Sequence, residues 1–412
     1  MTVVSIIFLI FILGDFVWCW KSLVRFRRLP QPWRMAGNVS LIIFTAVQMS
    51  GFLVLVFGRR VDLPVESFFP KSLIAGVYLW HCLVLLPMVF LWFLARVAGG
   101  ILWIGRTLVR PGQTEPAAPA TSHDGRSMTR REFAAAAVCV APAILTLGAT
   151  GIAAGQWNQF RVRHLIVPLP QLPTALDGLT IAQVSDLHVG VFTRGAILDR
   201  IVEATNQLRA DLVLLPGDLI NYALRDLPAG LDVVKRLEAP GGVLMCEGNH
   251  DLFEDPVAFR ERTAAAGVRL LVNETAIMQI REVPIQVLGL RWGSGGGDPH
   301  AMSNRGDLAI AGSMKELLIQ KKGDAFRILL AHHPHAFDYA EDIPLTLSGH
   351  THGGQIMLTK GIGFGPALFR YWSGLYQKAG RAMVVSNGVG NWFPLRVQAP
   401  AEIVHITLRA VR

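Results

Sequence analysis

The first 154 residues are patterned as a series of long apolar runs. Residues 3–20, 38–57 and 73–94 are almost continuously hydrophobic, and residues 134–154 contain no charged side chain. Each run is close to the roughly 20 residues that an α-helix needs to cross a bilayer. Trp and basic residues near the ends of the runs are typical of membrane interfaces. The pattern predicts an all-α transmembrane region of about four helices.

From residue 161 onward, short apolar runs alternate with stretches of helical periodicity, which indicates βαβ units. We expect strands at residues 179–184, 211–215, 242–246, 268–272, 276–281, 284–290, 326–330, 344–347, 382–386 and 402–408. We expect helices near residues 196–208, 231–237, 256–266 and 309–320. These are more strands than one open sheet holds comfortably. The predicted fold class is therefore α/β, an α+β sandwich of two mixed β-sheets flanked by helices.

These patterns predict four regions along the chain. Residues 1–106 form a membrane region with three transmembrane helices, and residues 107–132 form a Pro-containing linker. Residues 133–154 form a fourth transmembrane helix or a signal anchor, and residues 155–412 form the soluble domain.

The predicted linker ends in the box Ser127-Met128-Thr129-Arg130-Arg131-Glu132-Phe133. A Ser/Thr-Arg-Arg-x-Phe box before a mildly hydrophobic run is similar to a twin-arginine export signal. The alternative is that the two arginines are only the cytoplasmic anchor of a fourth transmembrane helix. Both interpretations place the following domain on the same side of the membrane.

Composition and charge support a membrane protein. Hydrophobic residues make up 51% of the 412 residues and charged residues only 17%. Residues 1–154 carry 14 Lys and Arg against 6 Asp and Glu, whereas residues 155–412 carry 25 against 24. The positive charge is concentrated in the first and third loops, which the positive-inside rule assigns to the cytoplasm. We therefore expect a multi-pass protein of the cell (inner) membrane with an extracytoplasmic soluble domain, and the balanced charge of that domain argues against nucleic acid as a partner.

Residues suited to metal binding follow five of the predicted strands. They lie in the motifs Asp186-x-His188, Gly217-Asp218, Gly248-Asn249-His250-Asp251, His332-x-Pro334 and Gly349-His350-Thr351-His352. In parallel sheets, functional residues collect at the carboxyl ends of the strands. Imidazole, carboxylate and amide ligands without thiolates suit Mn, Fe or Zn. The four cysteines show no CxxC spacing that would indicate a zinc or redox site.

The order and spacing of these motifs resemble the calcineurin-like metallophosphoesterase family over roughly residues 178–406. Gly374-Leu375-Tyr376 and residues 386–402 look like the bacterial membrane-attached branch with a twin-arginine-like signal. The resemblance implies a cofactor of two divalent metal ions (Mn, Fe or Zn). It implies that Asp186, His188 and His352 bind the first ion, that Asn249, His332 and His350 bind the second, and that Asp218 bridges the two.

The remaining site residues are assigned by their place beside these ligands. We expect His250, together with Asn249, to contact the substrate, and His250 to stabilise the phosphoryl oxygens or protonate the leaving group, with Asp251 orienting it. Asp251 has the alternative role of a helix N-cap. Tyr376 and Arg396 match positions of the family as candidate substrate-binding residues, with core and surface roles as their alternatives. His333 and His335 are not expected to be ligands.

The predicted function is hydrolysis of a phosphodiester or pyrophosphate bond by metal-activated water. The membrane tether favours a phosphoester substrate in the lipid or the envelope. The alternatives are a phosphomonoesterase and a catalytically silent membrane scaffold or sensor, although every motif residue is present. A transporter or channel is disfavoured because Asp15, Gln48, His81 and Arg96 are few and scattered along the apolar runs. We expect residues 293–298 and 361–374 to shape the substrate cleft.

Overall fold

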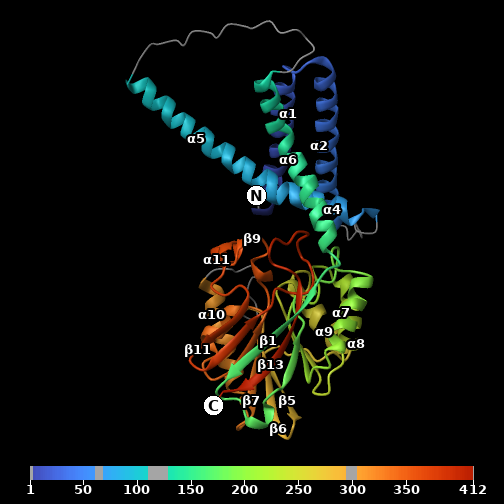
Figure 1. The fold of residues 1–412 in the computed structure, drawn as a ribbon, viewed down its shortest axis with the longest axis vertical. Helices are drawn as coiled ribbons and strands as arrows, with labels where there is room; N and C mark the ends of the chain where they lie inside the picture. Colours follow the sequence, from blue (N-terminus) through green and yellow to red (C-terminus); the bar gives the residue numbers. More distant parts are fainter. Residues whose placement is uncertain (1–2, 61–67, 110–128, 294–303, 412) are drawn as a thin grey trace. The chain divides into compact units, whose positions relative to one another are not determined.

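The structure, a computed structural model, describes residues 3–60, 68–109, 129–293 and 304–411. The chain forms two compact units, Met1–Ala154 and Gly155–Arg412. The first consists of helices, and the second contains two β-sheets with helices on their outer faces (Figure 1).

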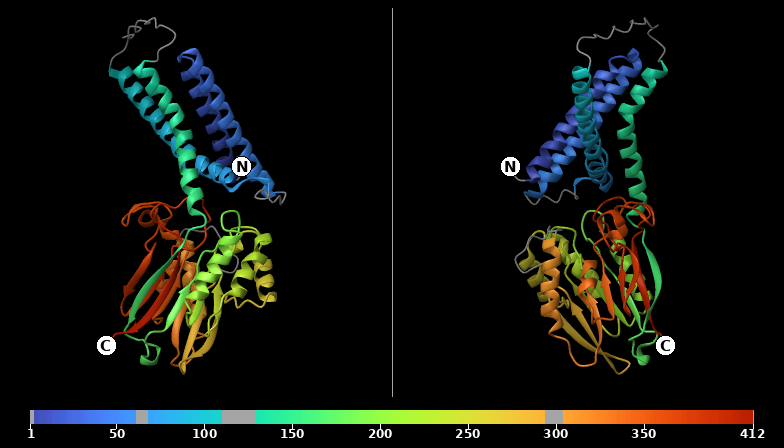
Figure 2. Two further views of the ribbon diagram at one scale, coloured as in Figure 1. Left: turned by 45° about the vertical axis from the view of Figure 1, so that its right-hand side comes forward. Right: turned by 90° about the vertical axis from the view of Figure 1, so that its left-hand side faces the viewer.

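The first unit contains the long apolar helices that the sequence predicts. They are α1 (Val3–Phe26), α2 (Gln31–Arg60), a third helix made of α4 (Lys71–Tyr78), the π-helical segment η1 (Leu79–Leu85) and α5 (Leu86–Val109), and α6 (Arg130–Gln156). Four helices within the described residues are long and apolar enough to cross a membrane. Figure 2 shows them from two further sides.

Helices occupy both ends of the region predicted as a linker, residues 107–132. Helix α5 continues to Val109 and α6 begins at Arg130, while residues 110–128 lie outside the described residues. The Thr129 hydroxyl accepts from the N–H of Glu132 (3.2 Å), and the Glu132 carboxylate accepts from the N–H of Thr129 (2.9 Å). This reciprocal pair is a capping box, so residues of the arginine box start a helix.

Two polar residues that are far apart in the sequence meet inside the first unit. Asp15 of α1 accepts from Trp80 Nε1 (2.6 Å) and lies 3.1 Å from His81 Nε2, and all three side chains are buried. His81 Nδ1 donates to the carbonyl of Val77 (2.8 Å). The expectation that the polar residues of the apolar runs are scattered is therefore wrong for Asp15 and His81. They form a buried polar contact between α1 and η1.

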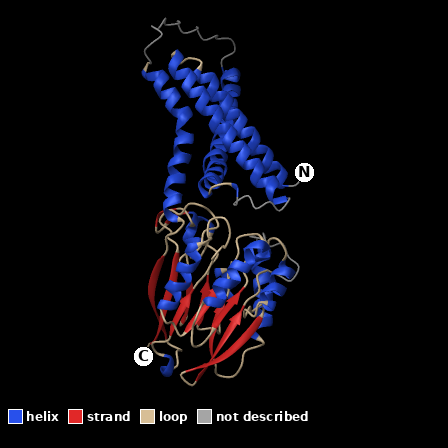
Figure 3. Cartoon of the chain, turned by 90° about the vertical axis from the view of Figure 1, so that its right-hand side faces the viewer, coloured by secondary structure: helices blue, strands red, loops and turns tan. Residues whose placement is uncertain are grey.

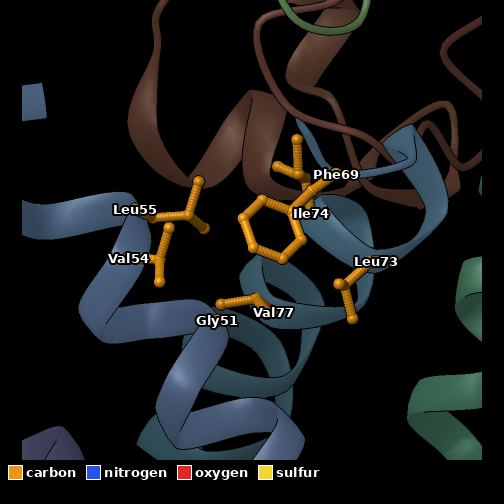
Figure 4. Close-up of a pocket in the computed structure, with 7 residues that line it drawn as sticks. All are labelled: Gly51, Val54, Leu55, Phe69, Leu73, Ile74 and Val77. Atoms are coloured by element: carbon orange, nitrogen blue, oxygen red, sulfur yellow. The ribbon is translucent and has the colours of Figure 1, made fainter. Parts of the chain in front are cut away.

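A small pocket between α2 and the start of the third helix is apolar throughout (Figure 4). Its lining consists of Gly51, Val54, Leu55, Phe69, Leu73, Ile74 and Val77. Because none of these side chains is polar, the pocket offers no group for catalysis or for binding a charged ligand.

The second unit is built on two mixed sheets. The first has the order β1–β13–β2–β3–β4, with bounds Arg161–Leu169, Glu402–Ala410, Thr180–Gln183, Leu212–Pro216 and Val243–Cys246. The second has the order β11–β12–β8–β7–β6–β5, with bounds Gly374–Lys378, Arg381–Val385, Leu345–Ser348, Phe326–Leu330, Val283–Gly289 and Glu274–Ile280. Strands β2, β3 and β4 are mutually parallel, as are β6, β7, β8 and β12.

Helices cover the outer faces of both sheets, as Figure 3 shows. They are α7 (Ala196–Gln207), α8 (Leu227–Arg236) and α9 (Pro256–Ala265) on the first sheet and α10 (Asn304–Leu318) on the second. Between the sheets, Ile181 and Leu214 share one buried apolar core with Val287, Ile328 and Leu347. The hairpin β9 (Met357–Thr359) and β10 (Ile362–Gly363) precedes α11 (Phe364–Leu368). Short 3-10 helices occupy Thr174–Leu176, Leu224–Asp226, His250–Leu252, Pro334–Tyr339 and His352–Gly354.

The fold class matches the prediction, and individual strands differ. Residues 268–272 are not a strand, because only Leu270 makes an isolated bridge, to Met245. The sequence reasoning missed β1, β11 and the β9–β10 hairpin. Strands β9, β10 and β11 are exposed or half-buried along much of their length and lack the apolar run that marks a buried strand. Strand β1 contains such a run at residues 165–169, but only Val167 and Leu169 of it are buried.

Candidate metal centre

The five strand-end motifs lie at one end of the two sheets. They follow β2, β3 and β4 of the first sheet and β7 and β8 of the second. Because β2, β3 and β4 are parallel to one another, and β7 is parallel to β8, the carboxyl ends of these strands point the same way within each sheet. Backbone hydrogen bonds join loops of the two sheets, for example from Val389 N, after β12, to the carbonyl of Ser185, after β2 (2.9 Å).

Three predicted ligands form a first group. His188 Nε2 lies 2.9 Å from His352 Nε2, and the Oδ1 atom of Asp186 lies 3.8 Å from the first and 3.4 Å from the second. All three side chains are buried. Two ring nitrogens and a carboxylate oxygen therefore face one point, which is the arrangement that a divalent cation requires.

A second group lies on the other side of Asp218. His332 Nε2 is 3.0 Å from the Oδ2 atom of Asp218, and His350 Nδ1 is 3.0 Å from the Oδ1 atom of Asn249. The same Oδ2 atom of Asp218 lies 3.4 Å from His188 Nε2 of the first group. Asp218 thus contacts both groups, as a bridging carboxylate would.

The backbone at these positions is unusual. Five predicted ligands have a positive φ, namely Asp186 (54°), His188 (46°), Asp218 (58°), His350 (72°) and His352 (50°). Non-glycine residues adopt this left-handed conformation rarely and at a cost, and such residues cluster at functional sites. The strain supports a functional role for this end of the sheets.

Two glycines are required by the close approach of the carboxylates. A Cβ atom on Gly248 would collide with the carboxylate of Asp218, and one on Gly349 would collide with the Asp186 carboxylate and the Ser185 hydroxyl. Here the missing side chains make room for the chain's own ligands.

The protonation of three of the buried histidines favours metal binding. Burial lowers the pKa values of His188, His350 and His352 well below the ordinary range, so these rings are neutral and keep a lone pair. Burial opposes the charged form of His332 as well, but the neighbouring Asp218 carboxylate raises its pKa to about 9. The position beside Asp218 therefore favours a positive charge.

The hydrogen bonds of the histidines test whether the site fits a metal. His332 Nδ1 donates to the carbonyl of Pro216 (2.7 Å), while its buried Nε2 faces the carboxylate of Asp218 (3.0 Å). This is the usual pattern of a metal-binding histidine, whose second nitrogen is fixed by a carbonyl or a carboxylate. The residues present fit two divalent cations.

His250 and Asp251 have different partners from those expected. His250 Nδ1 donates to the carbonyl of Asn221 (2.7 Å), so Asn221 orients the ring. The carboxylate of Asp251 accepts from the N–H groups of Asp218 (3.0 Å), Ile220 (3.0 Å) and Gly248 (2.9 Å). The predicted orientation of His250 by Asp251 is therefore wrong, because both oxygens of Asp251 are used to hold the backbone on either side of Asp218.

The alternative role of Asp251 as a helix cap does not hold for α9. Asp255 caps that helix and accepts from the N–H groups of Val257 and Ala258. Asp251 is instead a buried support for the loop that carries Asp218.

Arg396 and Tyr376 support the loop that carries His350 and His352. Arg396 is only 4% exposed, so its alternative as a surface residue is wrong, and its Nη2 lies 3.0 Å from His352 Nδ1. The Tyr376 hydroxyl accepts from the N–H of Trp372 (3.0 Å), whose carbonyl accepts from the Thr351 hydroxyl (2.7 Å). Both residues contact the protein around the centre, and their contact with a substrate stays a prediction.

Two tryptophans outside the predicted site residues border the centre. The ring of Trp292 lies 5.0 Å from that of His350 and 5.4 Å from that of His332. The Trp392 ring lies 6.2 Å from His250 and 6.1 Å from His352. No local pattern marks these two positions, because each tryptophan approaches the centre from a loop outside the five motifs.

Two further expectations concern His333 and the cleft loops. His333 Nδ1 accepts from the N–H of His335 (3.2 Å), which agrees with a capping role for His333. Apart from Gly293, the predicted cleft loop at residues 293–298 lies outside the described residues. In the second predicted cleft segment, Phe369 places its ring 5.9 Å from that of His350.

Comparison with known proteins agrees with this site. Residues 179–354 match the family model described as calcineurin-like phosphoesterase, which includes all five motifs. The chain is 30% identical to a transmembrane protein with metallophosphoesterase domain from Danio rerio, over 60% of this chain and 57% of that protein. It is 29% identical to the uncharacterized metallophosphoesterase YkuE of Bacillus subtilis (58% of this chain, 82% of the relative) and 27% identical to the phosphodiesterase YaeI of Escherichia coli (54% and 80%).

The second unit therefore contains a calcineurin-like metallophosphoesterase domain. The chain spans a little over half the length of the Danio rerio relative.

Proposed function

We propose that this protein is a membrane-anchored, metal-dependent phosphohydrolase that cleaves phosphodiester or pyrophosphate bonds. The observation that carries the proposal is the pair of ligand groups joined by one carboxylate, Asp218. Two cations a few ångströms apart repel each other strongly unless an anion lies between them. A shared buried carboxylate is thus the expected feature of a dinuclear site.

The proposed ligands are the residues of the two groups described above. Asp186, His188 and His352 would hold one divalent ion, Asn249, His332 and His350 would hold the other, and Asp218 would bind both. Bound there, two divalent ions supply an activated water for attack on phosphorus and neutralise the phosphoryl oxygens. We propose Mn, Fe or Zn as the metal on the basis of the nitrogen and oxygen donors.

Residues of the chain provide positioning and proton transfer. The Asn221 carbonyl keeps a proton on Nδ1 of His250, which leaves Nε2 of this half-buried ring for the substrate. In its protonated form His250 would donate from Nε2 to a phosphoryl oxygen or to the leaving group. The backbone N–H of His250 donates to the Oδ1 atom of Asp218 (2.9 Å), so the main chain that carries this ring is hydrogen-bonded to the proposed bridging residue.

The substrate class is proposed from the membrane segments and from the relatives. One relative is named a phosphodiesterase, which supports a diester over a monoester. The four apolar helices support a substrate in or near the membrane, such as a phospholipid or a nucleotide-linked lipid. The basic first and third loops support an extracytoplasmic domain.

The full-length protein in detergent, loaded with Mn²⁺, Zn²⁺ or Fe²⁺, tests the proposal. It should hydrolyse bis-p-nitrophenyl phosphate or a pyrophosphate ester faster than p-nitrophenyl phosphate, and a chelator should abolish turnover. The panel includes phospholipids and nucleotide-linked lipids. Two bound metal ions without turnover on any ester would reject the enzyme and favour the silent scaffold.

A further inference from the structure

Large apolar side chains are exposed together on one segment beside the metal centre. Leu358 (68% exposed), Ile362 (59%), Phe364 (49%) and Leu368 (61%) all lie in the hairpin β9–β10 and helix α11. We refer to residues 356–369 as the apolar lip. Other large hydrophobic residues exposed in the described part of the second unit lie far from one another in sequence. Isolated exposed apolar residues are normal, but a contiguous group indicates a contact surface.

The lip is attached to the metal centre at both ends. It begins four residues after His352, and Phe369 at its end places its ring 5.9 Å from the ring of His350. Hydrogen bonds between Phe364 N and the Ile356 carbonyl (3.1 Å) and between Phe369 N and the Gly365 carbonyl (2.9 Å) fold the segment back on itself. A molecule that contacts the exposed lip is thus held beside two proposed ligands.

The lip is also attached to the end of a candidate membrane span. Helix α6 ends at Gln156, which belongs to the second unit. The Gln156 side chain donates to the carbonyl of Arg396 (2.9 Å) and accepts from the Arg396 N–H (3.1 Å). The next residue, Val397, bonds to the lip through Met357 N (2.9 Å).

These connections, together with the charge of the lip, bear on which partner it would contact. Because α6 is long and apolar enough to span a bilayer, the chain leaves the hydrocarbon core near Gln156. Gln156 is hydrogen-bonded to Arg396, and the next residue, Val397, is hydrogen-bonded to Met357 of the lip. The only charged residue of residues 356–369 is Lys360, which matches the negative charge of lipid phosphates. Apolar side chains with a basic residue are typical of segments that lie in the membrane interface.

We propose that the apolar lip inserts into the bilayer surface and presents the metal centre to phosphoester groups that lie there. The evidence for insertion is the exposure of the apolar side chains and the hydrogen-bonded connection of the lip to the end of α6. The preference for a lipid phosphoester rests in addition on the proposed function. The exposed Trp392, whose ring lies 6.2 Å from that of His250 and 5.5 Å from that of Phe393, adds an amphipathic aromatic residue at the edge of the centre.

Fluorescence quenching tests the insertion without any measurement of catalysis. The full-length protein, with its native cysteines replaced by serine, carries Ile362→Cys labelled with an environment-sensitive dye. It is reconstituted in vesicles of phosphatidylethanolamine and phosphatidylglycerol. Lipids with a spin label on the acyl chain should quench this dye several-fold more than a dye at Ile319→Cys, an equally apolar position that is 78% exposed elsewhere on the domain. Equal quenching at the two positions would overturn the insertion.

Kinetics test the consequence for the substrate. The variant with Leu358, Ile362, Phe364 and Leu368 all changed to Ser should lose at least about tenfold in turnover of a phospholipid in the same vesicles. Its loss in turnover of bis-p-nitrophenyl phosphate should be at least about fivefold smaller than its loss on the phospholipid, and turnover of both substrates by Ile319→Ser should stay within about twofold of the unaltered protein. An equal loss on both substrates would contradict the proposed role of the lip. Turnover of neither substrate by the unaltered protein would reject the hydrolase, and the quenching result would still decide the insertion.

Discussion

The Nη2 atom of Arg396 lies 3.0 Å from the Nδ1 atom of His352, inside the protein. The same guanidinium donates to the carbonyls of Asn387 (2.8 Å) and Ala399 (3.1 Å) and to the Asn391 side chain (2.9 Å). Since a guanidinium has hydrogen-bond donors only, it cannot accept a hydrogen bond from His352. Burial and the Arg396 charge together hold the pKa of His352 well below its usual range, so the ring is neutral.

Arg396→Met should weaken metal binding at the first group. Loss of a residue that orients a ligand typically costs about 10–100-fold in metal affinity. The bound metal is measured by mass spectrometry across a titration with Mn²⁺. High Mn²⁺ should restore most of the activity if Arg396 only positions His352. Arg370→Met serves as the control, because Arg370 is exposed and pairs with Asp338. Unchanged metal affinity in Arg396→Met would contradict the positioning role.

Asp218→Asn should remove most of the activity and lower the number of bound metal ions. The amide cannot supply the negative charge that lies between the two ligand groups, and several kcal/mol of stabilisation would be lost, about a thousandfold in rate. Metal content and turnover of bis-p-nitrophenyl phosphate are measured together. A variant that keeps two metal ions and normal turnover would refute the bridging role.

His250→Gln should lower kcat by about 10²–10⁴-fold while leaving the metal content unchanged. If His250 protonates the leaving group, the decrease in kcat should be smaller for nitrophenyl esters than for other esters, because a nitrophenolate leaving group needs little protonation. His333→Gln is a neighbouring control at which we expect a small effect, because His333 caps a short helix. A loss of bound metal in His250→Gln would identify His250 as a ligand instead.

Asp15→Leu should destabilise the first unit. The substitution leaves the buried Trp80 Nε1 and His81 Nε2 without their shared acceptor, and interhelical polar contacts in membranes contribute about 1–2 kcal/mol. Thermal unfolding of the full-length protein in detergent should begin at a lower temperature than for Asp15→Asn, which keeps an acceptor oxygen. Equal stability of the two variants would show that this contact contributes little.

The double change Arg130→Lys and Arg131→Lys distinguishes the two interpretations of the arginine box. The capping box uses Thr129 and Glu132, so the start of α6 should survive the substitution. We expect unchanged membrane insertion and an unchanged location of the soluble domain, measured with a reporter after Arg412. Loss of export in the double variant would support a twin-arginine signal. Activity of a cytoplasm-only reporter at that position in the unaltered protein would reject the predicted topology.

Local sequence determined the elements and the composition of the site. Buried strands such as β3 and β7 are short apolar runs, and a run of this kind is visible without knowledge of its neighbours. The five motifs follow such runs directly, and the parallel arrangement within each sheet places Asp186 near Asp218 at one edge and His332 near His350 at another. That these two edges form one site was implied by the family resemblance. The membrane helices were predictable for the same reason, because the requirement for a long apolar run is local.

Only the tertiary structure decided which atoms face one another. Asn221 rather than Asp251 orients His250, and Asp15 meets His81 across 66 positions of the chain. Arg396 reaches His352 from a loop 44 residues away, and the exposed lip is linked to the end of α6 through a residue 240 positions distant. Such contacts depend on the packing of whole elements and on positive φ angles at the ligands, and no short stretch of sequence contains that information.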